Sequence, residues 1–330
     1  MNTLNFSKQI QLSLVLSLVF ALFSPLNALK AQQPNSVPVK AGQAFKAQKG
    51  RTDYSMHWDG KDRHFIVYIP QKYNPQQATP VVFMFHGTSG NGEKMYDRTK
   101  WKEGADKEGF IAIFPSSWRY YITDKGRVQT KWNSNGLPMV TKPGTHLMDD
   151  VGFVRAIVGS LRKSLNVDDK RIYASGFSNG GAFISSKVLP ELSDIFAAVS
   201  AGGGIFHQAI PMQHPAIPLY QIVGSNDSKL IDRLQVPIPT DASQWINDAT
   251  YGPFISNALK SLQLANTYDH QHTSKHSTLR YDDPLNGGRG KYIFSVISNM
   301  GHVYPNGSNN PHGFIAAKRF WAFFKNHPKP

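Results

Sequence analysis

Residues 176–180 read Gly-Phe-Ser-Asn-Gly, a G-x-S-x-G motif, and its place in the chain constrains the fold more than any other feature. A strand-like stretch, residues 171–175, ends directly before it, and a helix-like stretch, residues 179–189, follows. A sharp strand-to-helix turn exposes a serine hydroxyl and holds it rigidly, and the flanking glycines relieve crowding in the strained backbone. We therefore expect Ser178 to be a nucleophile. The alternative is a glycine-rich turn that happens to carry a serine.

Strand and helix patterns alternate through the rest of the chain. Continuous apolar runs such as residues 80–85 indicate strands covered on both faces, and apolar residues at helical spacing indicate a helix over residues 150–165. Two aspartates at the start of that helix suit its cap and dipole better than a metal site. The alternation predicts an α/β fold with a mostly parallel, doubly wound sheet and helices on both faces. Further strands are expected at residues 63–70, 110–114, 195–201, 217–223 and 292–297, and helices at 253–264 and from Pro311 to Phe324.

A base and an acid are expected to follow the serine, in the chain order serine, acid, histidine. Asp227 comes just past the carboxyl end of a predicted strand, on the same edge of the sheet as the serine turn. It could instead be a turn former, and Asp232 is a second candidate for the acid. His302 follows the strand at residues 292–297 and is the expected base.

Two main-chain N–H groups are expected to bind an oxyanion. One belongs to Asn179, directly after the serine, and the other to Thr88, in the loop after the strand at residues 80–85. His86 in the same loop precedes the serine and is expected to be structural. His270, His272 and His276 form a loose cluster whose i, i+2, i+6 spacing in a polar stretch is more typical of a solvated loop than of a metal site. We expect no metal and no cofactor.

Several segments together resemble a known family. They are residues 85–87 (F-H-G), 132–133 (W-N), 149–153 (D-D-V-G-F), 176–181 (G-F-S-N-G-G) and 301–305 (G-H-V-Y-P). The chain resembles, over about residues 50–326, the secreted polyhydroxybutyrate depolymerases and feruloyl esterases, which are α/β-hydrolases overlapping the first carbohydrate esterase family. The resemblance implies Ser178 as nucleophile, Asp227 as acid and His302 as base. Family members often carry G-G-G-H-T-W-P around the base, so Tyr304 replaces their tryptophan here, and the chain has no cysteine.

Two long connections, residues 115–145 and 228–288, leave the carboxyl edge of the predicted sheet. Loops of this length are usually functional or disordered, so we expect both to cover the site. Their aromatic side chains could bind a phenolic or hydrophobic acyl group or simply pack onto the body. As substrate-binding candidates we take Trp118, Trp132, Asn133 and Tyr304.

Composition bounds the domain organisation and partners. Residues 1–31 are expected to be a secretory signal peptide with cleavage after Ala28 or Ala31, a retained membrane anchor being the alternative. Residues 32–50 are expected to be a flexible lead-in, and residues 51–330 a single α/β-hydrolase catalytic domain. The formal net charge is +14, but lysines and arginines are scattered and no nucleic-acid-reading motif is found. We expect a secreted monomer, extracellular or periplasmic, without a nucleic-acid partner.

The sequence therefore predicts a serine carboxylesterase that acts through an acyl-enzyme on a polyester or on hydroxycinnamoyl or other acyl esters. The alternatives are a lipase or a peptidase with the same three residues, or a non-catalytic polymer-binding protein.

Overall fold

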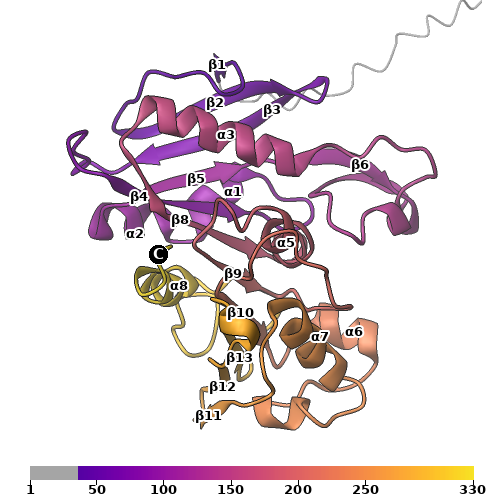
Figure 1. Ribbon diagram of the computed structural model, residues 1–330. Helices are drawn as coiled ribbons and strands as arrows, with labels where there is room; N and C mark the ends of the chain where they lie inside the picture. Colours follow the sequence, from indigo (N-terminus) through magenta and orange to yellow (C-terminus); the bar gives the residue numbers. More distant parts are fainter. Residues whose placement is uncertain (1–35) are drawn as a thin grey trace, which may run out of the picture. The chain divides into compact units, whose positions relative to one another are not determined.

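An eleven-stranded sheet runs through residues 36–330, the part of the chain that the computed structural model describes (Figure 1). The expected signal peptide lies outside these residues. The six central strands, β5-β4-β8-β9-β10-β13, are parallel. Antiparallel pairs extend the sheet on both sides, and β1 pairs in parallel with β2 at one edge. The order is β1-β2-β3-β5-β4-β8-β9-β10-β13-β12-β11, with strands β1 (Val37–Val39), β2 (Gly50–Trp58), β3 (Lys61–Ile69), β4 (Thr79–Phe85), β5 (Ile111–Pro115), β8 (Val167–Phe177), β9 (Ala198–Gly202), β10 (Leu219–Gly224), β11 (Asp269–His272), β12 (His276–Tyr281) and β13 (Tyr292–Ile297).

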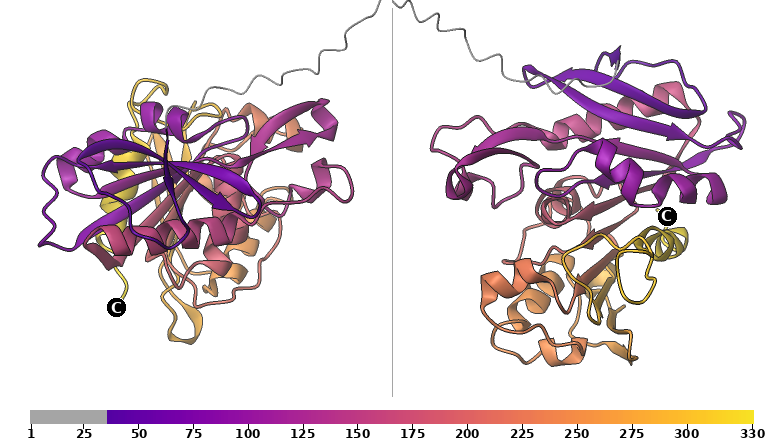
Figure 2. Two further views of the ribbon diagram at one scale, coloured as in Figure 1. Left: turned by 90° about the horizontal axis from the view of Figure 1, so that it is seen from above. Right: turned by 180° about the vertical axis from the view of Figure 1, so that it is seen from behind.

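Helices cover both faces of the sheet, because the central strands are apolar on both sides (Figure 2). Alternate residues of a strand point to opposite faces, and β4 shows the division. Phe83 and Phe85 belong to the core under α3, α4 and α7, whereas Val82 and Met84 belong to the core under α1, α2 and α8. The helices are α1 (Gly92–Arg98), α2 (Trp101–Glu108), α3 (Asp150–Ser164), α4 (Asn179–Phe183), α5 (Leu189–Glu191), α6 (Ser228–Leu234), α7 (Gly252–Leu262) and α8 (Ala316–Lys325). This is the predicted α/β-hydrolase fold.

The two long connections contain regular structure. Residues 115–145 form a hairpin of β6 (Trp118–Ile122) and β7 (Arg127–Lys131), with single turns at Thr123–Lys125 and Pro138–Val140. Residues 228–288 hold α6, a short 3-10 helix η4 (Ala242–Trp245), α7, β11, β12 and a turn at Leu285–Gly287. Because β11 and β12 widen the sheet and α7 packs on it, this connection contributes to the body of the domain. Its aromatics Trp245 and Tyr251 are buried in the core.

Two local expectations need correction. The helix after Ser178 is broken by a π-helical turn, Ile184–Val188, and continues across Pro190. The last helix begins at Ala316 and not at Pro311, because the Asn310 side chain accepts the N–H groups of His312 and Phe314 and holds a turn there.

The described part of the lead-in contacts the sheet and α3. Val37–Val39 pairs with β2, Phe45 is buried, and the Phe45 N–H donates to Ser164 Oγ at 2.8 Å. Residues 36–50, expected to be part of a flexible lead-in, therefore contact the rest of the domain at these two apolar positions, which their polar composition does not reveal. Between residues 36 and 330, no helix has the length and apolar character needed to cross a membrane.

Candidate active site

Ser178 stands at the turn between β8 and α4 with a main-chain φ of 53° and ψ of −115°. A non-glycine residue rarely adopts positive φ, so this backbone is strained and must be held by its surroundings. The Ser178 N–H donates to the Gly202 carbonyl at 2.7 Å. A Cβ at Gly176 would lie 2.3 Å from the Gly180 carbonyl oxygen, and one at Gly180 would lie 2.3 Å from the Phe85 carbonyl oxygen. The two glycines of the motif are therefore required by close packing.

The structure brings Ser178, His302 and Asp227 together. His302 Nε2 lies 2.9 Å from Ser178 Oγ, and His302 Nδ1 lies 2.7 Å from Asp227 Oδ2. Asp227 is almost fully buried, while His302 keeps part of its ring accessible. Asp232, the other acid candidate, is exposed on α6 and does not contact the imidazole. A hydroxyl, an imidazole and a carboxylate linked in this way can activate the hydroxyl as a nucleophile.

Neighbouring strands bring the acid and the base side by side. β10 and β13 are parallel partners, so the loops that follow them leave the same edge of the sheet. These loops are also bonded to each other: the Asn226 N–H donates to the Met300 carbonyl at 2.9 Å, and the Asn299 N–H donates to Ser225 Oγ at 2.8 Å. Asp227 Oδ1 in addition caps α6 by accepting from the N–H of Lys229 and Leu230.

The two expected oxyanion donors flank the serine turn. Among residues 36–330, neither the Thr88 nor the Asn179 main-chain N–H has a protein acceptor, and Asn179 stands in the first turn of α4, where N–H groups lack helical partners. The Asn179 side chain is tied to the next loop, because its Oδ1 accepts the Trp132 N–H at 2.6 Å. Lys131 Nζ lies 3.4 Å from Thr88 Oγ1, and burial lowers the pKa of this lysine.

His86 and Trp132 form the support beneath the Thr88 loop. His86 is fully buried, its Nδ1 donates to the Gly87 carbonyl at 2.7 Å, and its Nε2 accepts the Ser117 N–H at 2.9 Å. Burial lowers the pKa of His86 to about 4, so the ring is neutral and structural at pH 7.

Trp132 is also fully buried, with its ring 5.1 Å from those of Phe85 and Phe183, and its Nε1–H donates to the His86 carbonyl. The prediction that Trp132 contacts substrate is wrong, because the tryptophan packs the loop onto the core.

The other substrate-binding candidates differ in exposure. Tyr304 is buried, and its hydroxyl lies 2.8 Å from Trp101 Nε1 and 3.2 Å from Ser175 Oγ. The prediction for Tyr304 is therefore wrong as well. Asn133 is half-buried and uses its amide to bond the Met148 carbonyl. Trp118 is half-buried on β6, directly opposite Lys131 of β7.

A buried ion pair beside the site escaped the sequence analysis. Arg63 Nη2 lies 2.5 Å from Asp150 Oδ1, and both side chains are almost completely buried. The second Asp150 oxygen accepts the Asn133 N–H at 2.7 Å. Asp149 caps α3 as expected, accepting the Gly152 N–H at 2.7 Å. The pair thus fixes the start of α3 to the loop that follows β7. The sequence signal that could have revealed this pair is an arginine at the start of the strand-like, mostly apolar residues 63–70.

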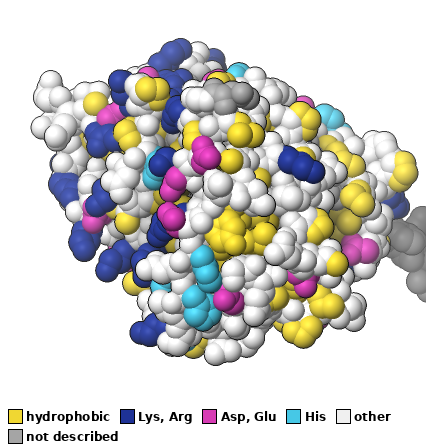
Figure 3. Space-filling view, turned by 60° about the horizontal axis from the view of Figure 1, so that its bottom comes forward, with side chains coloured by type: hydrophobic (Ala, Val, Ile, Leu, Met, Phe, Trp, Pro, Cys, Tyr) yellow, Lys and Arg dark blue, Asp and Glu magenta, His cyan; other side chains and the backbone are white. Residues whose placement is uncertain are grey.

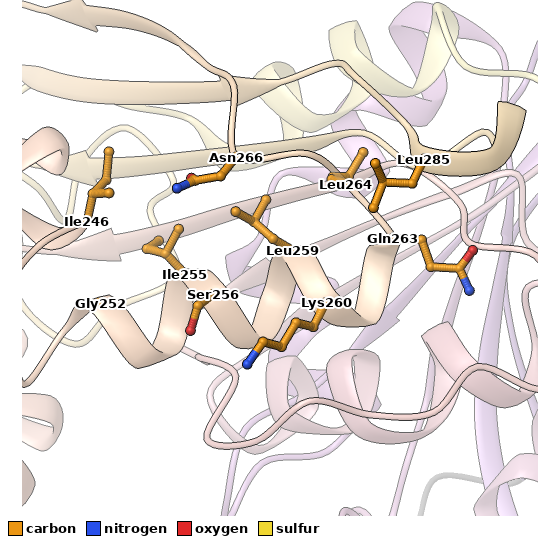
Figure 4. Close-up of a pocket in the computed structure, with 10 residues that line it drawn as sticks. All are labelled: Ile246, Gly252, Ile255, Ser256, Leu259, Lys260, Gln263, Leu264, Asn266 and Leu285. Atoms are coloured by element: carbon orange, nitrogen blue, oxygen red, sulfur yellow. The ribbon is translucent and has the colours of Figure 1, made fainter.

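A groove of about 540 Å³ beside α7 contains none of these residues (Figure 4). Five Ile and Leu side chains line it together with four polar ones, Ser256, Lys260, Gln263 and Asn266. None of its lining residues belongs to the serine turn or to the loops that carry Asp227 and His302, so we do not include it in the site. Its lining residues are Ile246, Gly252, Ile255, Ser256, Leu259, Lys260, Gln263, Leu264, Asn266 and Leu285.

Comparison with known proteins supports the fold. The chain is 29% identical over 171 residues to a bifunctional acetylxylan esterase/xylanase from Neocallimastix patriciarum, which covers 52% of this chain and 22% of that protein. It is 28% identical over 138 residues to feruloyl esterase B from Piromyces equi, covering 42% of this chain and 23% of that protein. The chain thus spans less than a quarter of the length of these two relatives.

A solved acetyl xylan esterase from Aspergillus awamori has a TM-score of 0.53 at 13% identity, with 80% of this chain and 94% of that chain covered. The α/β-hydrolase fold is therefore confirmed. No protein-family model matches the chain.

Proposed function

We propose that this chain is a serine carboxylesterase that works through an acyl-enzyme. The observation that carries the proposal is the placement of His302 between Ser178 Oγ, at 2.9 Å, and Asp227 Oδ2, at 2.7 Å. His302 takes the Ser178 proton as the hydroxyl attacks the ester carbonyl, and Asp227 orients the imidazole and stabilises its cation. The esterase names of the relatives support this reaction over peptide hydrolysis.

The oxyanion of each tetrahedral intermediate is held by the N–H groups of Thr88 and Asn179. Collapse of the first intermediate expels the alcohol, which takes the proton from His302. Water then attacks the acyl-enzyme, giving its proton to His302, and the second collapse returns that proton to Ser178 and releases the acid. These steps use only groups of the chain and water, so no metal or cofactor enters the reaction.

For the substrate we propose esters of hydroxycinnamic or short hydroxy acids, including polyesters of 3-hydroxybutyrate, and we propose that the protein is secreted. Trp118 supports an aromatic or apolar acyl group. Residues directly opposite in an antiparallel pair share one face, so Trp118 and Lys131 lie on the same side of the hairpin, and Lys131 adjoins Thr88. The resemblance to polyhydroxybutyrate depolymerases and feruloyl esterases supports the same two classes of ester.

A panel of purified esters tests the proposal: feruloyl, acetyl and 3-hydroxybutyryl esters, a long-chain triglyceride emulsion and a peptide. We expect turnover of the first group by the wild type and its loss in Ser178→Ala. Interfacial activation on the emulsion would indicate a lipase instead. Failure of a fluorophosphonate to label Ser178 in folded protein would indicate a non-catalytic binding protein.

A further inference from the structure

A second cluster of reactive side chains lies at the far edge of the sheet, on β11. This strand is five positions along the sheet from β8, which leads to Ser178. At a spacing of 4.7–4.9 Å per strand, the separation is roughly 24 Å. The cluster comprises Asp241, His270 and His272, whose potential ligand atoms all lie within 4.8 Å of one another. On the face shown in Figure 3, histidine side chains lie together next to an acidic side chain.

The two histidines share one face of an edge strand. The sequence analysis placed them in a solvated loop, but residues Asp269–His272 pair with β12 in antiparallel register. Because side chains alternate along a strand, residues i and i+2 point the same way. The His270 and His272 rings therefore stand side by side, with their centroids 6.2 Å apart. Both remain partly accessible to solvent.

Asp241 is held in place opposite these rings. It is the N-cap of η4 and accepts from the Ser243 N–H and the Ser243 hydroxyl, both at 2.9 Å. The buried Ser277 hydroxyl on β12 also donates to Asp241 Oδ1 at 3.0 Å. η4 is anchored by Trp245, which is fully buried with its ring 4.7 Å from that of Phe294. The carboxylate is thus preorganised by backbone and core contacts, as good metal ligands are.

The distances suit a small divalent ion. His270 Nε2 lies 2.9 Å from Asp241 Oδ1, and His272 Nδ1 lies 3.7 Å from Asp241 Oδ2. Around a tetrahedral ion with ligands at 2.0–2.1 Å, neighbouring ligand atoms are about 3.3 Å apart. The two observed separations, which involve different oxygens of Asp241, lie on either side of this value, and all the potential ligand atoms lie within 4.8 Å of one another. Two imidazoles and a carboxylate are a donor set that favours Zn²⁺ and related transition metals over Mg²⁺ or Ca²⁺.

We propose that Asp241, His270 and His272 bind one divalent transition-metal ion of the Zn²⁺ class, with solvent completing its coordination. The ion would join the β11–β12 hairpin to the segment that follows α6. Its position far from Ser178 makes this a stabilising site, separate from ester hydrolysis and independent of the proposed function.

A histidine–aspartate contact alone does not make such a site, and the chain provides a matched control. His146 Nε2 lies 2.9 Å from Asp59 Oδ2, the same length as the His270–Asp241 contact. Within the described residues, this pair is not part of any group of three potential ligands. Its histidine is exposed, so His146→Ala removes a comparable histidine–aspartate contact and leaves the proposed site unchanged.

The test uses the full chain made without a polyhistidine tag and freed of metal by a chelator. Calorimetric titration with Zn²⁺ should give one ion per chain, and Co²⁺ should give the visible absorption of a low-symmetry site. Because each ligand contributes directly, His272→Ala and Asp241→Asn should weaken Zn²⁺ binding by more than ~10-fold. Zn²⁺ should raise the Tm of the wild type and of His146→Ala but not of His272→Ala.

Two further measurements keep the result decisive. Circular dichroism and ester turnover of the metal-free variants verify that His272→Ala and Asp241→Asn are folded, since neither residue belongs to the proposed catalytic site. If Asp241→Asn is misfolded, His272→Ala alone decides. The proposal is overturned if the wild type binds no stoichiometric Zn²⁺, or if the folded His272→Ala variant binds it as tightly as His146→Ala does.

Discussion

Asp227 uses its two carboxylate oxygens for two different partners: Oδ2 lies 2.7 Å from His302 Nδ1, and Oδ1 accepts the N–H groups of Lys229 and Leu230 at the start of α6. These two N–H groups fix the orientation of the carboxylate. The proposed catalytic acid is therefore oriented by the same turn that begins α6.

Replacing Asp227 by Asn separates these two functions. Asparagine is as good an N-cap as aspartate, so α6 and the Tm should be kept. Its amide would, however, favour the wrong imidazole tautomer, and turnover should fall by ~10⁴ with little change in substrate affinity. Steady-state kinetics check this. The matched variant Asp232→Asn, on the exposed surface of α6, should change turnover by less than about tenfold, and the opposite ranking would show that the acid is misassigned.

Removal of the proposed nucleophile should abolish hydrolysis without harming the fold. We expect Ser178→Ala to lower turnover by ~10⁴ to 10⁶, since the three linked residues act as one unit. Its Tm should stay within a few degrees of the wild type. Progress curves with a feruloyl or acetyl ester provide the measurement, and a folded variant that keeps substantial activity would rule out the serine mechanism.

The two tryptophans near the Thr88 loop should respond differently to truncation. Trp132→Ala should lower the free energy of unfolding by about 3–5 kcal/mol, because it empties a fully buried aromatic site. Trp118→Ala, on the half-buried face of β6, should leave stability nearly unchanged and raise KM for aromatic acyl esters. Chemical denaturation and kinetics on both variants test this. Equal stability losses would place Trp118 in the core, and an unchanged KM would remove it from the substrate site.

The neutral buried His86 should make stability depend on pH. Burial lowers its pKa from 6.5 to about 4, so the unfolded chain binds this proton more readily than the folded protein does. The contribution is fully present above pH 6.5 and is lost as the pH falls towards 4, by roughly 3 kcal/mol at pH 4. Denaturation at pH 7, 5.5 and 4 measures it. A His86→Gln variant, whatever its stability at pH 7, should show a shallower loss, and a slope equal to that of the wild type would contradict the assignment.

Local signals predicted the central parallel strands and the order of the site residues. The apolar runs that became β4, β5, β10 and β13 are long enough to specify buried strands. The glycines at positions 176 and 180 indicated the tight turn that carries Ser178, because no larger residue fits there. The antiparallel strands β11 and β12 were missed because both are rich in polar residues: β11 lies exposed at the edge of the sheet, and β12 buries Ser277 and Thr278. Their pairing depends on contacts with β13, which no local pattern reveals.

The direction in which a side chain points was harder to predict than the positions of helices and strands. Trp132 and Tyr304 lie close in sequence to residues of the candidate site, yet both side chains are buried in the core. Burial of a large aromatic ring is favourable, and nearness to a motif in sequence does not show which way the ring points. The partnership of Arg63 with Asp150 joins residues 87 positions apart. Asp241 and the two histidines of β11 are likewise brought together by the sheet and not by sequence spacing.

Because Ser178 has a positive φ, a substitution that stabilises the backbone at this residue would also remove the proposed nucleophile. Glycine is the residue that relaxes this conformation at least cost, so Ser178→Gly would relieve backbone strain and destroy the nucleophile at the same time. A library of variants screened for heat resistance alone would therefore be drawn towards inactive proteins at this position. Selection for ester hydrolysis has to be applied in every round if improved stability is to be useful.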